Sequence, residues 1–254
     1  MVRALIDAGC DVDKTNNVTA NNATPLWAAA NVGRADVVRL LLASGCDKEK
    51  VAEGGTSPLW IASGQGHARV IGELIVAGCD LDKVVDLCVC VCVFCFTEKS
   101  THTLSVLKKG CVHRRCSHQH THTHTHTHTH THTYTQAADG GPTPLFVAAQ
   151  RGRLEVVRQL LDAGSDTEKA REGGSTPLWI AAEVGQEDVV RELLAAGCHR
   201  NAQAEGGTSP LWIAAMKGHT RSLHEMIVAG CDVNKVVANF FFVLFTNLHI
   251  LSRY

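Results

Sequence analysis

The stretch Thr176–Pro177–Leu178–Trp179–Ile180–Ala181–Ala182 decides the fold, because near-copies of it recur along the chain at a fixed spacing. The other copies begin at Thr24, Ser57, Thr143 and Ser209. Neighbouring copies are 33 residues apart, except that 86 residues separate Ser57 from Thr143, which exceeds one period by 53. The chain is therefore a repeat array with a single interruption.

The period of 33 and the Thr-Pro-Leu opening of these copies resemble the ankyrin-repeat family, whose pattern is T-P-L-H-x-A. The resemblance implies an all-α solenoid of helix-turn-helix repeats, in which each repeat buries its apolar face against its neighbours. Where the family has His, this chain has an aromatic residue in every copy: Trp27, Trp60, Phe146, Trp179 and Trp212. Because one falls in each repeat, we interpret this column as packing between repeats rather than as ligand stacking.

Each repeat contains the signals for two helices. Thr176 is expected to be the N-cap of the first helix, and Pro177 suits its first turn, where a missing N–H costs nothing. Gly185 is expected to end this helix, and Gly197 to follow the second one in the left-handed conformation. The second helix has an apolar stripe of helical period, made by Val189, Val190, Leu193 and Leu194.

The order of these signals divides the chain into four parts. Residues 1–84 hold half a repeat and two full ones, 85–136 form an insert, 137–236 hold three repeats, and 237–254 form a non-repeat hydrophobic tail. Met1–Gly9 aligns with Val37–Gly45, the second helix of a repeat, so we expect the first helix of the opening repeat to lie upstream of this sequence.

The insert is low in complexity and is predicted to be disordered. It alternates Val and Cys from Cys88 to Val93 and carries six Thr-His pairs from Thr121 to His132. Alternating GT encodes Val-Cys and alternating AC encodes Thr-His, and such dinucleotide repeats are commoner in introns than in exons. Our working hypothesis is that the insert and the tail are two retained introns. An alternative is that the chain is a fragmentary gene product with no independent function.

Cysteine and histidine are unevenly distributed. Six of the 11 cysteines and ten of the 15 histidines lie between Cys88 and His132. This density suggests metal binding as an alternative function, but alternating Thr-His gives no contact that would fix ligand geometry, and structural zinc sites use closed sets of four ligands. The remaining cysteines share one repeat position, with Ser165 in the sixth place, and are expected to be free, small and buried: Cys10, Cys46, Cys79, Cys198 and Cys231.

Composition narrows the classes of partner. The chain has 254 residues and a formal charge of −1, and its repeats alone are mildly acidic, which argues against a nucleic-acid backbone as the target. The apolar runs at 87–96 and 240–245 fall short of the ~20 residues of a membrane-spanning helix. No signal peptide opens the chain, and free cysteines suit a reducing compartment, so a cytoplasmic location is expected, with a nuclear one as the alternative.

No catalytic constellation, phosphate-binding loop or cofactor motif is present, so we expect a protein-binding scaffold without a cofactor rather than an enzyme. In the family, partners contact the turn tips and the exposed end of the first helix, along the concave side. The resemblance implies the following positions here: Glu53, Thr56, Gln65, Gln150, Arg151, Glu172, Ser175, Glu183, Glu205, Thr208, Met216 and Lys217. This strip is mixed and mostly acidic, and it suits a protein partner with a basic or amphipathic segment.

Overall fold

The computed structural model describes residues 2–15, 22–52, 54–85 and 141–234. Within these ranges it contains eleven α-helices, one short 3-10 helix and no strand. The insert, apart from Val85, and the tail lie outside the described residues, so the predicted disorder and the intron hypothesis stay predictions. The all-α architecture is confirmed.

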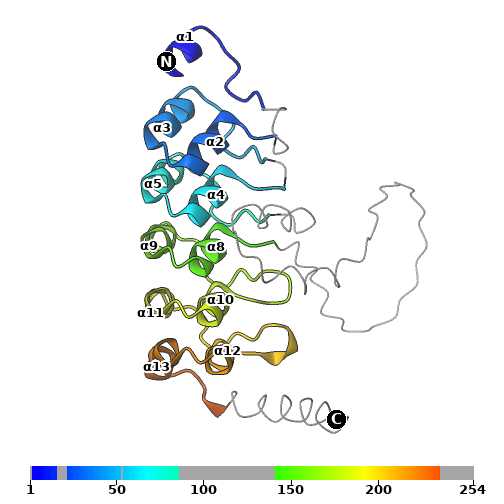
Figure 1. Cartoon of the computed structure of the whole chain (residues 1–254), viewed down its shortest axis with the longest axis vertical. Helices are drawn as coiled ribbons and strands as arrows, with labels where there is room; N and C mark the ends of the chain where they lie inside the picture. The colour runs from blue at the N-terminus through cyan, green and yellow to red at the C-terminus, as the bar shows by residue number, and fades with distance from the viewer. Residues whose placement is uncertain (1, 16–21, 53, 86–140, 235–254) are drawn as a thin grey trace, which may run out of the picture.

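The helices alternate between two layers (Figure 1). The first helices of the repeats are α2 (Pro25–Val32), α4 (Pro58–Gln65), α8 (Pro144–Gln150), α10 (Pro177–Val184) and α12 (Pro210–Lys217). The second helices are α1 (Val2–Asp7), α3 (Ala35–Ala43), α5 (Ala68–Val76), α9 (Leu154–Asp162), α11 (Glu187–Ala195) and α13 (Thr220–Val228). The long loops that join successive repeats project on the side of the first helices, and one of them contains the 3-10 helix η1 (Glu205–Gly207).

Every first helix begins with the same cap. Thr176 has extended backbone angles and its hydroxyl accepts a hydrogen bond from the Trp179 N–H, at 3.2 Å, while Pro177 fills the first position. The equivalent Thr or Ser does the same in α2, α4, α8 and α12. The predicted start of the first helix is therefore confirmed in all five repeats.

The glycine that follows α10 has two roles. Gly185 adopts a φ of +80°, which favours glycine, and it ends α10 as predicted. A Cβ at this position would also lie 2.5 Å from Nδ1 of His219 in the next repeat. The ring of His219 occupies that space and hydrogen-bonds through Nε2 to the Glu183 carbonyl oxygen, at 2.9 Å. Because a carbonyl can only accept, Nε2 must carry the proton.

The repeats on both sides of the insert form one stack. Helix α4 packs against α8, and α5 against α9, as neighbouring repeats do elsewhere in the array. The backbone N–H of Asp166 donates to Oδ1 of Asp82 across this junction, at 3.1 Å, in the way that the N–H of Asp47 donates to Asp13 between the opening repeats. Repeat stacking therefore continues across the sequence interruption.

The last described residue before the gap and the first one after it lie close together at this junction. Val85 is buried in the core at the position that Ala52 occupies one repeat earlier. A Cβ on Gly141 would lie only 1.4 Å from the carbonyl oxygen of Val85, so the two backbones approach closely. The described backbone on the two sides of the interruption is therefore adjacent in space.

The cysteine column is buried in four repeats and exposed in one. Cys46, Cys79, Cys198 and Cys231 are buried, as predicted. Cys10 is exposed, so its predicted burial is wrong. It follows α1 at the end of the stack, where α1 packs against α3 and has no first helix of its own repeat beside it.

Candidate functional site

The aromatic column connects neighbouring repeats by hydrogen bonds as well as by packing. The indole N–H of Trp27 donates to the Thr56 hydroxyl at 3.1 Å, and that of Trp179 donates to the Thr208 hydroxyl at 3.3 Å. At the insert junction Pro142 stands at the equivalent position, and the Trp60 indole donates to its carbonyl oxygen at 2.9 Å. The column is therefore structural, and the indole supplies an inter-repeat hydrogen bond in place of the family's His.

Two of the expected partner-binding threonines have structural roles. Thr56 is completely buried, and its hydroxyl is occupied by Trp27, so its expected place on the exposed strip is wrong. Thr208 is half-buried and accepts from Trp179. The pattern gave no sign of this, because the acceptor of an indole N–H lies 29 residues away in the sequence. Glu53 lies outside the described residues.

The remaining expected residues fall into an exposed and a half-buried group. Glu172, Glu205, Met216 and Lys217 are exposed. The half-buried ones are Gln65, Gln150, Arg151, Ser175 and Glu183. Several of them are already engaged between repeats. Gln65 donates to the Asn31 side chain at 3.2 Å, and Lys217 forms a long ion pair with Glu183, at 3.8 Å.

The loop tips bring two carboxylates onto neighbouring repeats. The backbone N–H of Glu205 donates to the Gly173 carbonyl oxygen at 2.7 Å, which joins the two tips and places Glu172 and Glu205 on adjacent loops. Within the described residues neither carboxylate takes part in an ion pair. These tips are therefore the acidic part of the strip, whereas Glu183 is offset by Lys217.

Exposed apolar side chains stand at the ends of three first helices, and the sequence analysis did not single out two of them. Val32 ends α2, Val184 ends α10 and Met216 lies near the end of α12, and all three are exposed. Val32 and Val184 occupy a repeat position that is polar elsewhere, with Gln65, Arg151 and Lys217. The presence of Val at this position in two repeats, against polar residues in the other three, could have indicated an apolar part of the strip from the sequence alone.

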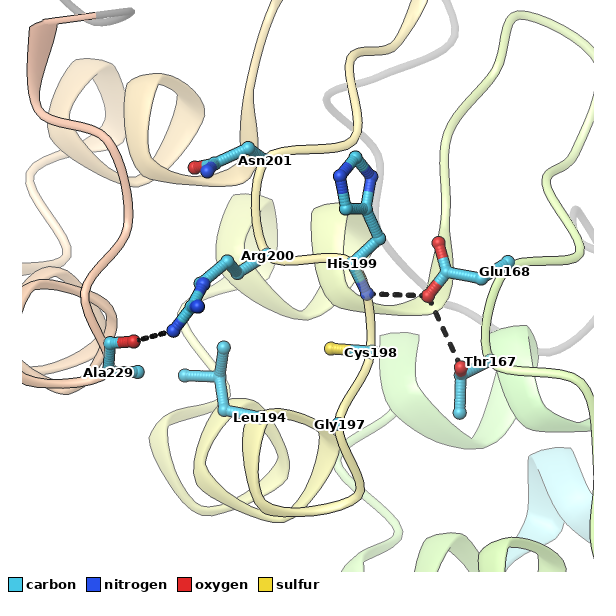
Figure 2. Close-up of a pocket in the computed structure, with 9 residues that line it drawn as sticks. All are labelled: Thr167, Glu168, Leu194, Gly197, Cys198, His199, Arg200, Asn201 and Ala229. Carbon is cyan, nitrogen blue, oxygen red and sulfur yellow. Dashed lines mark hydrogen bonds between the residues drawn. The ribbon is translucent and has the colours of Figure 1, made fainter.

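A pocket of about 740 Å³ lies where the loops after α9 and α11 meet the end of α13 (Figure 2). Its polar groups mostly hold the repeats together. Glu168 accepts the N–H of His199 at 2.6 Å, and Arg200 donates to the Ala229 carbonyl at the end of α13. Lys48 makes the same contact with the Ala77 carbonyl three repeats earlier in the stack, so the arrangement belongs to the repeat architecture.

The buried thiols of the column are poor nucleophiles. Burial raises the pKa of Cys46 to about 11 and that of Cys79 and Cys198 to about 12. A thiol must ionise to attack or to bind a metal, so these side chains stay inert at neutral pH. In the part of the chain that the structure describes, no group of three or more His, Cys, Asp or Glu could hold a metal ion. The insert's His and Cys residues lie outside it, and the metal-binding alternative stays a prediction.

No helix among the described residues has the length and apolar character needed to cross a membrane.

The charged side chains on the second helices form ion pairs between neighbouring repeats. Arg158 pairs with Glu192 at 2.6 Å, and Arg191 pairs with Glu225 at 3.1 Å. The hydrogen bond from Arg191 lowers the pKa of the Glu225 carboxyl. These pairs are exposed, so each adds little to stability.

The sequence matches the family model for ankyrin repeats in three copies, over residues 1–84, 116–204 and 145–237. The chain belongs to the ankyrin-repeat family. Ankyrin repeats are protein–protein interaction modules and are in general non-enzymatic scaffolds. A search of curated proteins found no match to this chain.

Proposed function

We propose that this chain is a non-enzymatic scaffold that binds a protein segment along the ends of the first helices and the loop tips beside them. The observation that carries the proposal is the exposure of Val32, Val184 and Met216 at or near the C-terminal ends of three first helices. The first helices form the layer on whose side the loops project (Figure 1). Scattered exposed apolar residues need no explanation. These three, in contrast, all stand at the last two positions of first helices, and Val184 and Met216 belong to neighbouring repeats, which supports a contact surface.

The proposed partner is a basic, amphipathic segment. Its apolar side chains contact Val184 and Met216, and its basic side chains reach Glu172 and Glu205, whose carboxylates have no ion-pair partner within the described residues. Neighbouring repeats stack at about the 8–10 Å of packed helices. Apolar anchors on the partner are therefore spaced by about 10 Å, which is three residues of extended chain or seven of helix.

Peptides selected from a random displayed library test this proposal. The tightest peptide is expected to combine apolar anchors with Lys or Arg, and its affinity is expected to fall with added salt. The double variant Val184→Ser, Met216→Ser should weaken binding by about tenfold or more, since two exposed apolar contacts together contribute roughly 1.4 kcal/mol or more. Val76→Ser is the matched control, because Val76 is exposed on a second helix, in the other layer.

The charged part has its own test. Glu172→Gln with Glu205→Gln should remove most of the salt dependence and leave the unfolding midpoint unchanged, since both side chains are exposed. If Val76→Ser abolishes peptide binding and neither double variant affects it, the binding surface lies elsewhere and the proposal is wrong.

We also propose a reducing, cytoplasmic setting. It is supported by the four buried free thiols, which are available for oxidation if the array opens. Fractionation of cells that express the tagged chain tests it, and secretion of the chain into the medium would contradict it.

A further inference from the structure

The loops that follow the second helices bind lysine side chains of the next repeat. The backbone N–H of Asp80 donates to Oε1 of Glu49 in the preceding repeat, at 2.8 Å. The Lys83 ammonium donates to Oε2 of the same carboxylate, at 3.1 Å, and to the Glu49 carbonyl oxygen, at 2.6 Å. Lys50 reaches the carbonyl oxygen of Asp13 in the same way, at 2.9 Å. An acidic residue of one repeat therefore holds the ammonium group of the next.

Glu168 has the same acceptors without the lysine. Its Oε1 accepts the N–H of His199 in the next repeat, at 2.6 Å, as at Glu49. The residue that corresponds to Lys83 is Ala202, whose side chain cannot donate a hydrogen bond. Among the described residues, neither Oε2 nor the carbonyl oxygen of Glu168 has a hydrogen-bond or ion-pair partner.

The loss of the lysine coincides with the pocket of Figure 2. The earlier described repeats have lysine at the position of Ala202: Lys14, Lys50, Lys83 and Lys169. The pocket wall includes Glu168 together with the apolar side chains of Leu194 and Ala229. Arg200 also lines it, but Figure 2 shows this side chain turned toward Ala229, to whose carbonyl oxygen it donates. The pocket therefore combines an unpaired carboxylate oxygen with apolar surface.

We propose that this pocket binds a lysine side chain of a partner protein, in the manner in which Glu49 binds a lysine of this chain. The ammonium group donates to Oε2 and to the carbonyl oxygen of Glu168, and the alkyl stem lies against Leu194 and Ala229. A single exposed ion pair is weak, so the lysine contributes to a larger contact. The site does not depend on the strip of the proposed function, because none of its residues belongs to that strip.

The test is an NMR titration of the full ¹⁵N-labelled chain with N-acetyl-lysine methylamide, followed at the His199 backbone N–H, which is bonded to Glu168. A saturable shift is expected with this probe and none with its norleucine analogue, which has an alkyl stem without the ammonium. Ala202→Lys should remove the response, because the chain's own lysine then occupies the acceptors. Glu168→Gln should weaken binding about fivefold.

Gln203→Lys is the matched control for Ala202→Lys, since it adds the same charge at the next residue, which is exposed. It should leave the titration unchanged. Ala202→Lys should also raise the unfolding midpoint by about 1–3 °C, and Gln203→Lys should not. The double variant Glu172→Gln, Glu205→Gln should not alter the titration, which separates this site from the strip.

A shift that persists in Ala202→Lys, or an equal response to the norleucine analogue, would overturn the proposal. Binding of spermidine without binding of the lysine probe would also overturn it, since the ligand would then be a free polyamine and not a protein side chain.

Discussion

Replacing Gly185 by Ala tests whether the glycine after each first helix serves the helix end or the next repeat. Gly218 is the matched control, because it occupies the same position in the last described repeat, with a φ of +77° against +80° for Gly185. A Cβ on Gly218 would meet nothing within 4 Å, whereas one on Gly185 would lie 2.5–2.8 Å from three atoms of the His219 ring.

The magnitudes separate the two variants. In both variants Ala must adopt the left-handed conformation, which costs about 1–2 kcal/mol. The lower conformational entropy of the unfolded Ala variant offsets about 0.4–1 kcal/mol of that cost. Gly218→Ala should therefore destabilise by about 1 kcal/mol. At Gly185 the His219 ring must also move by about 1 Å to restore ordinary contact, which adds about 1–3 kcal/mol of overpacking. Its hydrogen bond to Glu183 is then lost, at about 0.5–1.5 kcal/mol.

The assay is equilibrium urea unfolding followed by far-ultraviolet circular dichroism. Gly185→Ala is expected to exceed Gly218→Ala by about 2–4 kcal/mol. Adding His219→Ala should remove most of this difference, because the ring that the Cβ meets is gone. Equal destabilisation by the two glycine substitutions, or a Gly185 effect that persists without the His219 ring, would refute the reasoning.

The remaining predictions follow from burial and from the insert junction. Deleting residues 86–138 restores the 33-residue spacing between Ser57 and Thr143, so one cooperative urea transition should remain; loss of the helical signal would show that the insert belongs to the core. Trp60→Ala should cost about 3–5 kcal/mol in the same assay, and Trp179→Ala less, because Trp60 is 2% exposed and Trp179 is half-buried; the reverse order would be contrary to the packing. Ser165→Cys should stabilise by about 1 kcal/mol, since the buried Ser165 hydroxyl has no hydrogen-bond partner among the described residues; a loss of stability would contradict this. Burial raises the pKa of Cys79 and Cys198 to about 12, so these thiols ionise at lower pH in the unfolded chain than in the folded one. The free energy of unfolding should therefore fall as the pH rises from about 9 toward 12, and it should fall less steeply in the double variant Cys79→Ala, Cys198→Ala. An unchanged slope in the double variant would refute this prediction.

The fold was predictable because its determinants are local and repeated. A Thr or Ser cap and a following Pro fix the start of each first helix, and they are confirmed in all five repeats. A left-handed Gly caps the end of four of them, whereas α8 ends one residue earlier and is capped by Arg151. For contacts between repeats, the sequence predicted which residues pack but not which residues they bond to. Packing of Trp27 follows from its place in the column, but its acceptor Thr56 is 29 residues away and looks like a polar loop residue in the sequence. Cys10 looks like the other cysteines in the sequence, but it is exposed, and the described residues place no first helix of the same repeat beside α1.

The candidate site was harder to predict because exposure, pairing and charge are settled by neighbouring repeats. Glu183 and Glu172 are both acidic residues near the strip, but Lys217 of the next repeat pairs with Glu183, whereas Glu172 has no such partner within the described residues. The sequence therefore overstates the acidity of the helix row and understates its apolar part at Val184.

The variation between repeats explains why the proposed surface can be specific without weakening the stack. The position of the aromatic column must fill the space between repeats, and each repeat has Trp or Phe there. The position at the end of the first helix does not have to fill that space, and successive repeats have different residues there: Val32, Gln65, Arg151, Val184 and Lys217. Gln65 and Lys217 make polar contacts with the preceding repeat, but the side chain at this position varies from repeat to repeat, so it can differ according to the partner. Substitutions there should change binding and leave unfolding almost unchanged, whereas substitutions in the aromatic column should do the opposite.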